Sequence, residues 1–355
     1  MSTKMRRYIT VILSTILIAL IILLIIDTRE LKNLSDSRAR ESEGNNNGIK
    51  IGLSMGTLKE DRWLRDRDIF VARAKALGTD VIVQNANNND EDQVEQVNYL
   101  LSRGIDVLVI VPNDREKSAD AVEAAKKAGV KVIAYDRLVL KSNVDLYISF
   151  DSQEVGKLMA QALVDKVPRG NYLIINGDPS DNNTSLLKKG YDDVLAPLAK
   201  AGEINIIAEE WAEDWMSEYA FNITEKYLQK GTKIDAILAA DDMLAAGAIR
   251  ALSEYKLSGK AMVTGQDADL TACQRIVDGT QFMTVYKPVD RLAEEAVDMA
   301  VKLAKGESIS VPNTIYDGKY DVPYYVLQPV AVDISNLDDT VIKDGFHNYD
   351  EIYGR

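Results

Sequence analysis

The chain has 355 residues, 46% of them hydrophobic, and carries a formal net charge of −13. This length is enough for two domains, at ~150 residues each, with a large buried core. The negative charge argues against a protein that binds nucleic acid through a general basic surface. A single cysteine, Cys273, excludes an intrachain disulfide framework and a cysteine-based metal cluster.

The N-terminal segment predicts a membrane anchor ahead of the folded domains. A basic start is followed by Tyr8–Ile26, an uncharged run rich in Ile, Leu and Val. Its length is close to the ~20 residues of a membrane-spanning helix and exceeds the ~7–15 apolar residues of a cleaved signal peptide, which is the alternative. The basic flank keeps the N-terminus in the cytoplasm. We expect residues 1–27 to be a cytoplasmic stub and uncleaved signal anchor, and residues 28–48 to be a flexible tether.

From Ile49 onward, short apolar runs alternate with helix-period segments. The runs that predict strands are Lys50–Met55, Val81–Gln84, Val107–Val111, Val130–Tyr135 and Leu146–Phe150, followed by Tyr172–Asn176, Ile204–Ala208, Ala236–Ala239, Ala261–Thr264 and Met283–Tyr286. Fully apolar strands between amphipathic helices are typical of parallel sheets covered on both faces. The two series predict two doubly wound parallel-sheet α/β domains, with the first crossing between them near Asp151.

Polar and aromatic side chains follow nearly every predicted strand at its C-terminal end. They are Arg62 and Trp63, Asp136 and Arg137, Asp181 and Asn183, Trp211 and Trp215, Asp241 and Asp242, and Gln266 and Asp267. Each residue taken singly also fits a helix cap or a surface loop. In open α/β sheets, however, ligands lie at the carboxyl ends of the strands, so two facing domains would line one cleft with these residues. An arginine beside an indole suits a sugar, because Arg donates to hydroxyls and Trp packs on the ring face.

The sequence contains no motif for nucleotide binding or nucleophilic catalysis. Gly56 and Thr57, which follow the first strand, match neither the dinucleotide fingerprint nor a P-loop. The only histidine, His347, lies in the polar tail, so no core base is available to activate a serine or cysteine. Cys273 is expected to be a buried core thiol. We therefore predict no catalytic residue and no cofactor, although paired carboxylates leave glycoside hydrolysis open.

A run of Asn and Asp at Asn85–Asp92 is similar in composition to a calcium-binding loop. It lacks the mid-loop Gly and the terminal Glu that an EF-hand requires. We expect its side chains to cap the following helix, Val94–Arg103, and we predict no metal site.

Several blocks of the sequence resemble the D-xylose-binding proteins, which belong to the type I periplasmic sugar-binding proteins. These blocks are Leu58–Phe70, Ala134–Arg137, Tyr147–Asp151, Asp181–Asn183, Gly265–Asp269, Val285–Pro288 and Thr340–His347. The resemblance covers the chain from Ile49 to about His347. It implies the type I periplasmic-binding-protein fold, in which two α/β lobes are joined by a three-crossover hinge and close on one pentose.

The resemblance also implies how the chain is divided between the lobes. A third crossover would return the chain after roughly Val311, so that both lobes are discontinuous. The implied segments are 49–151 plus about 288–312 for the N-terminal lobe, 152–287 plus about 313–345 for the C-terminal lobe, and 346–355 for a tail.

Ten residues are implied as sugar-binding by this resemblance. Hydroxyl partners would be Arg62, Asp136 and Arg137 from the N-terminal lobe, with Asp181, Asn183, Asp241, Asp267 and Lys287 from the C-terminal lobe and hinge, while Trp63 and Trp215 would sandwich the sugar ring. The family usually has Asn-Asp where this chain has Asp241-Asp242. An ionised Asp only accepts hydrogen bonds, whereas Asn also donates, so this position bears on fine specificity.

Two functional interpretations follow from the same binding event. The first is a membrane-anchored D-xylose receptor whose closure is detected by a membrane sensor histidine kinase, because an uncleaved anchor accompanies a complete set of cleft residues. The alternative is the substrate-binding component of an ATP-driven (ABC) importer of xylose or another pentose. A sugar-acting enzyme is disfavoured because no carboxylate has a companion base or metal ligand. A repressor of this fold is disfavoured because the anchor occupies the place of a DNA-binding segment.

Overall fold

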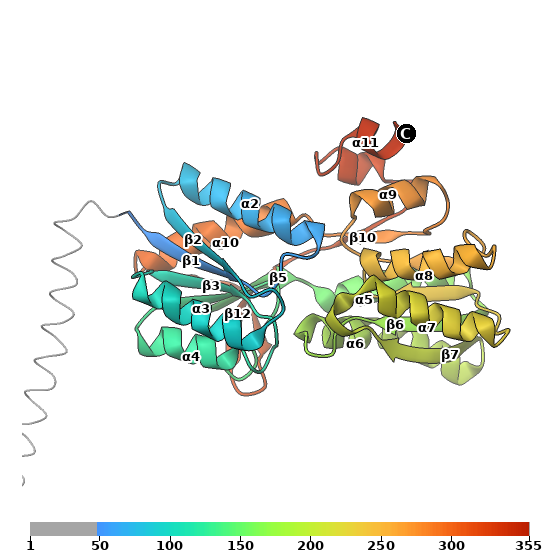
Figure 1. The fold of residues 1–355 in the computed structure, drawn as a ribbon, viewed down its shortest axis with the longest axis horizontal. Coiled ribbons are helices and arrows are strands. Elements are labelled where there is room, and N and C mark those ends of the chain that lie inside the picture. Colours follow the sequence, from blue (N-terminus) through green and yellow to red (C-terminus); the bar gives the residue numbers. More distant parts are fainter. Residues whose placement is uncertain (1–47, 355) are drawn as a thin grey trace, which may run out of the picture. The chain divides into compact units, whose positions relative to one another are not determined.

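The structure, a computed structural model, describes residues 48–354 of the chain (Figure 1). The anchor expected at Tyr8–Ile26 and nearly all of the expected tether lie outside these residues. Within the described part, no helix combines the length and the apolar composition needed to cross a bilayer. Ile49–Arg355 forms one compact unit, and the fold described below is that of this unit.

The N-terminal lobe is a seven-stranded sheet with helices on both faces (Figure 1). Its strands are β1 (Lys50–Met55), β2 (Asp80–Asn85), β3 (Val107–Val111), β4 (Lys131–Tyr135), β5 (Leu146–Phe150), β11 (Asn313–Tyr316) and β12 (Asp321–Leu327), in the order β11-β12-β5-β4-β3-β1-β2. Its helices are α2 (Asp61–Ala76), α3 (Asp90–Ser102), α4 (Ala119–Lys127) and α10 (Val289–Ala304). Neighbouring strands are parallel, except that β11 runs antiparallel to β12.

Strand β3 illustrates why these apolar runs form central strands. All of its residues are buried. Val107, Val109 and Val111 pack in the core that α2 and α10 cover, whereas Leu108 and Ile110 pack in the core that α3 and α4 cover. Because successive side chains of a strand point to opposite faces, a strand covered on both faces has to be apolar at every position.

The C-terminal lobe contains a four-stranded parallel sheet and a small antiparallel pair. Its strands are β6 (Gly170–Asn176), β7 (Ile204–Trp211), β8 (Ala236–Ala239) and β9 (Met262–Thr264), in the order β7-β6-β8-β9, with β10 (Thr284–Tyr286) paired to β13 (Val330–Val332). Its helices are α5 (Ser152–Lys166), α6 (Asn182–Ala201), α7 (Ser217–Gln229), α8 (Asp242–Glu254) and α9 (Leu270–Val277), with a 3₁₀ turn, η1, at Glu213–Trp215. Helix α5 packs against α6, and α7 packs against α8.

The chain passes between the lobes after β5, after β10 and after β12. The family resemblance implies that residues 313–345 belong to the C-terminal lobe, and this is wrong for residues 313–327. Strands β11 and β12 extend the N-terminal sheet, because β12 pairs in parallel with β5 at the edge that β4 leaves free. The third crossing therefore lies after Leu327 rather than near Val311. Only the short strand β13, beyond Pro329, belongs to the C-terminal lobe.

The C-terminal tail, which in the structure comprises residues 338–354 rather than only the expected 346–355, contacts both lobes. Its elements are a π-helical turn at Asp338–Ile342 and α11 (Tyr349–Tyr353), and α11 packs against α9. Arg65 of α2 donates from Nη1 to the Phe346 carbonyl at 2.9 Å. The His347 Nε2 atom lies 2.8 Å from the carbonyl oxygen of Ala268 in the other lobe. The tail therefore bridges the two lobes.

Helices α5 and α6 approach each other closely because each presents a glycine to the other. A Cβ atom added at Gly190 would lie 2.0 Å from the carbonyl oxygen of Gln153, and one added at Gly156 would lie 2.2 Å from that of Leu187. Both contacts are with backbone atoms, so a side chain at either position has to push the helices apart.

Gly190→Ala should therefore destabilise the protein, although Ala has a higher helix propensity than Gly by about 1 kcal/mol. We expect the free energy of unfolding to fall by about 1–3 kcal/mol, the usual cost of overpacking a core. Urea unfolding of the Ile49–Arg355 fragment, followed by circular dichroism, measures this change. Lys189→Ala, at an exposed position of the same helix, is the control and should change stability by less than about 0.5 kcal/mol. Equal stability of Gly190→Ala and the wild type would contradict the close contact.

Candidate functional site

A polar cavity lies between the two lobes, where the strands of both sheets end. It contains about 420 Å³ of space, part of it at the open mouth, which is within the ~300–1,000 Å³ usual for small-molecule sites. All the residues that the sequence predicts as sugar-binding line this cavity: Arg62, Trp63, Asp136, Arg137, Asp181, Asn183, Trp215, Asp241, Asp267 and Lys287. The fold thus brings these residues together from strand exits that are far apart in the chain.

Arg62, in the first turn of α2, joins carboxylates from both lobes. Its Nη2 donates to Asp136 Oδ2 at 2.8 Å in the N-terminal lobe, and its Nη1 donates to Asp267 Oδ1 at 3.2 Å in the C-terminal lobe. The carboxylate of Asp66, one turn further along α2, lies 3.5 Å from Nε. Burial by itself would lower the pKa of Arg62, but the three carboxylates raise this pKa well above its usual range. Arg62 is therefore a permanent cation between the lobes.

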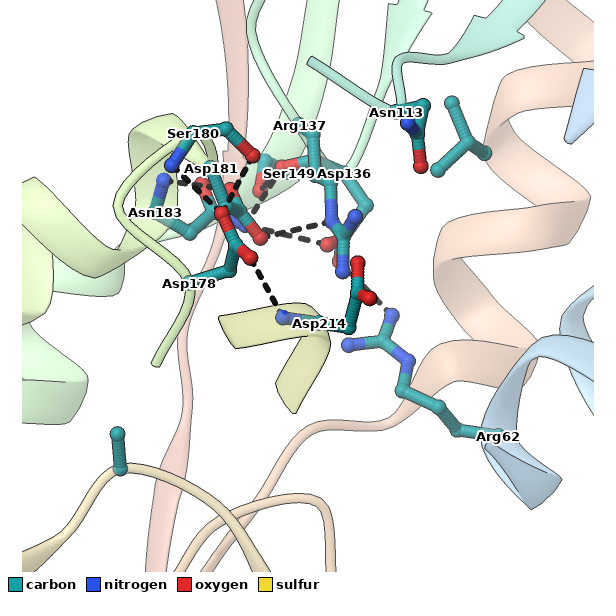
Figure 2. Close-up of polar contacts among 12 residues, drawn as sticks. Arg62, Asn113, Asp136, Arg137, Ser149, Asp178, Ser180, Asp181, Asn183 and Asp214 are labelled. Carbon is teal, nitrogen blue, oxygen red and sulfur yellow. Dashed lines mark hydrogen bonds and ion pairs between the residues drawn. The ribbon is translucent and has the colours of Figure 1, made fainter. Parts of the chain in front are cut away.

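Hydrogen bonds fix the backbone of Asp136 as well as its side chain. Asp136 directly follows β4 and has a φ of +61°, a region that favours glycine. The hydroxyls of Tyr147 and Ser149 donate to its carbonyl oxygen at 2.9 and 2.6 Å. The side-chain amide of Asn183, from the other lobe, donates to this carbonyl and to Asp136 Oδ1, both at 3.1 Å (Figure 2). These contacts hold a strained residue in place, as is common in ligand-binding sites.

Asp136 and Asp267 provide the negative charge of the cavity. Burial opposes the ionisation of Asp136, but Arg62, Lys287 and Arg137 together hold its pKa below the usual value. Lys287 Nζ lies 2.7 Å from Asp267 Oδ1, and Asp267 also has a positive φ, of +97°. The cavity therefore offers fixed donors and fixed acceptors side by side, which is the arrangement that suits hydroxyl groups.

Arg137 and Asp181 form a second ion pair between the lobes (Figure 2). Arg137 Nε lies 2.8 Å from Asp181 Oδ2, and the two side chains are only 9% and 2% exposed. Burial raises the pKa of Asp181 even though Arg137 opposes the shift. Asp181 also caps α6, because its Oδ1 accepts the N–H of Asn183 at 2.8 Å. The side chain of Asn183 is thereby left free to reach Asp136.

The two indole rings of the cavity belong to Trp63 and Trp215, which are 2% and 7% exposed. The guanidinium carbons of Arg62 and Arg137 lie 4.2 and 5.2 Å from the centre of the Trp63 ring, so these cations also hold the ring in place. Trp215 lies in η1, and its Nε1 has no hydrogen-bond partner among the described residues. The sandwich of a sugar ring between the two indoles stays a prediction.

Asp241 and Asp242 have different positions at the start of α8. Asp241 lines the cavity and caps the helix, with Oδ1 accepting the N–H of Leu244 at 2.7 Å. Asp242 is outside the cavity lining, and its oxygens accept the Asp269 N–H at 3.0 Å and two side-chain donors. Burial raises the pKa of Asp241 well above its usual range and that of Asp242 to about 7. Asp242 thus anchors the loop that carries Asp267.

Four cavity residues are outside the ten implied as sugar-binding: Glu60, Ser152, Leu187 and Gln266. Glu60 Oε2 is buried and has no hydrogen-bond partner in the described part of the chain. It is therefore an acceptor available to a ligand. Gln266 donates to the Ala240 carbonyl at 2.8 Å and so connects the exits of β8 and β9. Gln266 was expected in the cleft because it lies in a strand-exit loop, and the same signal could have identified Glu60, which lies in the loop after β1.

Residues that the sequence excludes from chemistry have structural roles. Cys273 is buried and burial raises the pKa of its thiol, which confirms the predicted core position. Burial lowers the pKa of His347. Asn89 Oδ1 accepts the N–H of Asp92 at 3.0 Å and caps α3, which confirms the capping interpretation of this run. Within residues 48–354, no group of His, Cys, Asp and Glu is arranged to hold a metal ion.

Arg62→Ala should destabilise the protein, because Asp66, Asp136 and Asp267 lose their common cation. We expect the free energy of unfolding to fall by about 3 kcal/mol near pH 8, the usual result of leaving a buried charge unpaired. Without the cation, the buried carboxyls of the variant would have pKa values above those of the unfolded chain. The variant therefore loses stability as the pH rises. The difference in free energy of unfolding between variant and wild type should be smaller near pH 5 than near pH 8. Urea unfolding at both pH values measures the deficit, with Arg67→Ala in the same helix as the control. An equal deficit at both pH values would contradict this account.

Comparison with known proteins identifies the family of this chain. Residues 51–308 match the family described as periplasmic binding protein domain. The D-xylose-binding periplasmic protein of Haemophilus influenzae is 45% identical over 313 residues, which cover 88% of this chain and 94% of that protein. The protein of the same name from Escherichia coli is 46% identical over 305 residues, which cover 86% of this chain and 92% of that protein.

Solved structures of sugar-binding proteins have the same fold. An ABC transporter solute binding protein from Clostridium phytofermentans, with bound β-D-glucose, is 30% identical, with a TM-score of 0.80 over 85% of this chain and 99% of that one. A carbohydrate transporter solute binding protein from Chloroflexus aurantiacus, in complex with D-glucose, is 33% identical, with a TM-score of 0.80 over 85% and 97%. The chain therefore belongs to the D-xylose-binding protein family of the type I periplasmic sugar-binding proteins.

Proposed function

We propose that the chain is an extracytoplasmic, membrane-anchored receptor that closes on one molecule of D-xylose and signals to a membrane sensor histidine kinase. Family membership makes it a sugar-binding protein and not an enzyme. The observation that carries the proposal is the convergence of hydrogen-bonding side chains from both lobes, with two indoles, on one cavity. Two relatives that are 45% and 46% identical bear the name of D-xylose, which supports a pentose as the ligand.

The cavity supplies the hydrogen bonds that a pentose requires. Each sugar hydroxyl is both a donor and an acceptor. Arg62 and Lys287 donate, Asp136 and Asp267 accept, and the amide of Asn183 can do both. A buried polar group left unpaired costs ~1–3 kcal/mol, so a sugar with a missing or inverted hydroxyl is rejected. The indoles cover the apolar faces of the sugar ring and exclude water.

Sugar binding favours closure of the two lobes because the sugar contacts are divided between them. Arg62, Trp63 and Asp136 are on one side of the cleft, and Asn183 and Trp215 are on the other. A ligand that contacts both sides binds the closed arrangement better, and it shifts the equilibrium between open and closed forms by that difference in affinity. The closed arrangement is the state that a partner protein in the membrane would recognise.

Trp63→Ala and Arg62→Ala should each raise the Kd for D-xylose at least about 30-fold, equivalent to ~2 kcal/mol, because each removes a cavity wall or a shared donor. Titration calorimetry of the Ile49–Arg355 fragment measures this, and the same titration with other pentoses and hexoses defines specificity. Trp211→Ala is the matched control, since this indole is 38% exposed and outside the cavity lining. Unchanged affinity of Trp63→Ala would show that the sugar binds elsewhere.

The signalling part of the proposal rests on the anchor expected at Tyr8–Ile26, which lies outside the described residues. A binding protein that serves an importer is typically free to diffuse to its permease. An anchored receptor instead stays beside one membrane partner, and this favours a sensor kinase as that partner. The alternative is the substrate-binding component of an ABC importer of xylose or another pentose. It is supported by the related solved structures, both of which are solute binding proteins of transporters.

The full-length chain should remain in the membrane fraction after alkaline extraction, whereas a chain that lacks residues 1–27 should be released. Cross-linking followed by purification from membranes should recover a sensor histidine kinase in an amount that depends on D-xylose, because closure changes the surface that the kinase contacts. Recovery of a permease alone, together with lost uptake of labelled xylose in a deletion strain, would support the importer instead.

A further inference from the structure

We propose that Gly177 and Asp178, at the exit of β6, are positioning residues that set the orientation of Trp215 and thereby the affinity of the cavity for sugar. Neither residue lines the cavity described above. The inference rests on the proposed function, in which Trp215 contacts the sugar.

The indole of Trp215 occupies the space that a side chain at residue 177 would need. A Cβ atom added at Gly177 would lie 2.2, 2.3 and 2.4 Å from Cη2, Cζ3 and Cζ2 of Trp215. These atoms belong to the six-membered ring of the indole, at the end furthest from its own backbone. Gly177 does not have a positive φ, so glycine is required here for space and not for conformation.

Asp178 fixes the backbone that carries the indole. Its Oδ2 accepts the N–H of Asp214 at 2.6 Å, and its Oδ1 accepts the N–H of Ser180 at 2.7 Å (Figure 2). Asp214 and Trp215 have φ values of +52° and +55°, a conformation that costs ~1–3 kcal/mol for a residue with a side chain. One carboxylate therefore ties the exit of β6 to a strained turn, and this turn places the Trp215 ring against the cavity.

The segment Gly177–Asp181 also contacts the N-terminal lobe. The N–H of Arg115 donates to the Ser180 carbonyl at 3.0 Å, and Arg137 pairs with Asp181. One end of this segment therefore supports the indole, and the other end makes contacts that join the lobes. A displaced Trp215 would disturb the sugar contact directly. Because the same segment contacts the N-terminal lobe, its displacement would also disturb the contact between the lobes.

A double-mutant cycle in the full-length protein tests the proposal. Gly177→Ala should raise the Kd for D-xylose about tenfold or more, because the indole has to move. Trp215→Phe removes the distal ring atoms that the new methyl group would meet. Adding Gly177→Ala to Trp215→Phe should therefore change the Kd by less than about twofold. Asp178→Asn, which keeps the shape but removes one acceptor, is an independent second variant and should also raise the Kd.

Gly170→Ala is the matched control, because it makes the same substitution at the other end of β6, where the added Cβ atom would lie 2.8 Å from Cβ of Asp235 and away from the cavity lining. It should change the Kd by less than about twofold, although it lowers stability. Near-UV circular dichroism without sugar should differ between Gly177→Ala and the wild type while the far-UV spectra coincide. An equal increase in Kd with and without Trp215→Phe would overturn the proposal. Absence of D-xylose binding by the wild type would refute the proposed function instead, and the near-UV comparison would still test the placement of the indole.

Discussion

One buried guanidinium, that of Arg62, is held between carboxylates of the two lobes, and the cleft is organised around it. Asp136 and Asp267 reach it from opposite lobes at 2.8 and 3.2 Å. A charge cannot be buried without partners, so the approach of the lobes depends on loops that present carboxylates at this place. The same carboxylates retain acceptor capacity toward the cavity. Lobe contact and the proposed ligand recognition would therefore share these two carboxylates.

The backbone at the strand exits is strained where side chains face the cavity. Asp136, Trp215 and Asp267 all have positive φ values, which cost ~1–3 kcal/mol each. The surrounding contacts make this conformation tolerable: hydroxyls and an amide hold the Asp136 carbonyl, and Asp178 holds the turn before Trp215. A relaxed connection from strand to helix would direct these side chains elsewhere. The strain is thus part of how the cavity is formed.

Much of the fold could be predicted from local sequence patterns, and the cavity residues from these patterns together with the family resemblance. The run Val107–Val111 reads as a central strand because both of its faces are covered. Arg62 and Asp136 stand where strands release into loops, and such loops meet at one edge of a parallel sheet. Glu60 was missed because one carboxylate in a charged loop carries no local sign of burial. Gly177 was missed because the ring that it accommodates lies far along the chain.

The sequence by itself determined the α/β class, the positions of most strands and many of the side chains that face the cleft, because alternation, periodicity and strand ends are local properties. Only the tertiary structure decided that β12 pairs with β5, which moves residues 313–327 into the N-terminal lobe. It also decided that Asp241 faces the cavity while Asp242 anchors a loop. Adjacent aspartates look alike in sequence, and their roles depend on contacts made by residues distant in the chain.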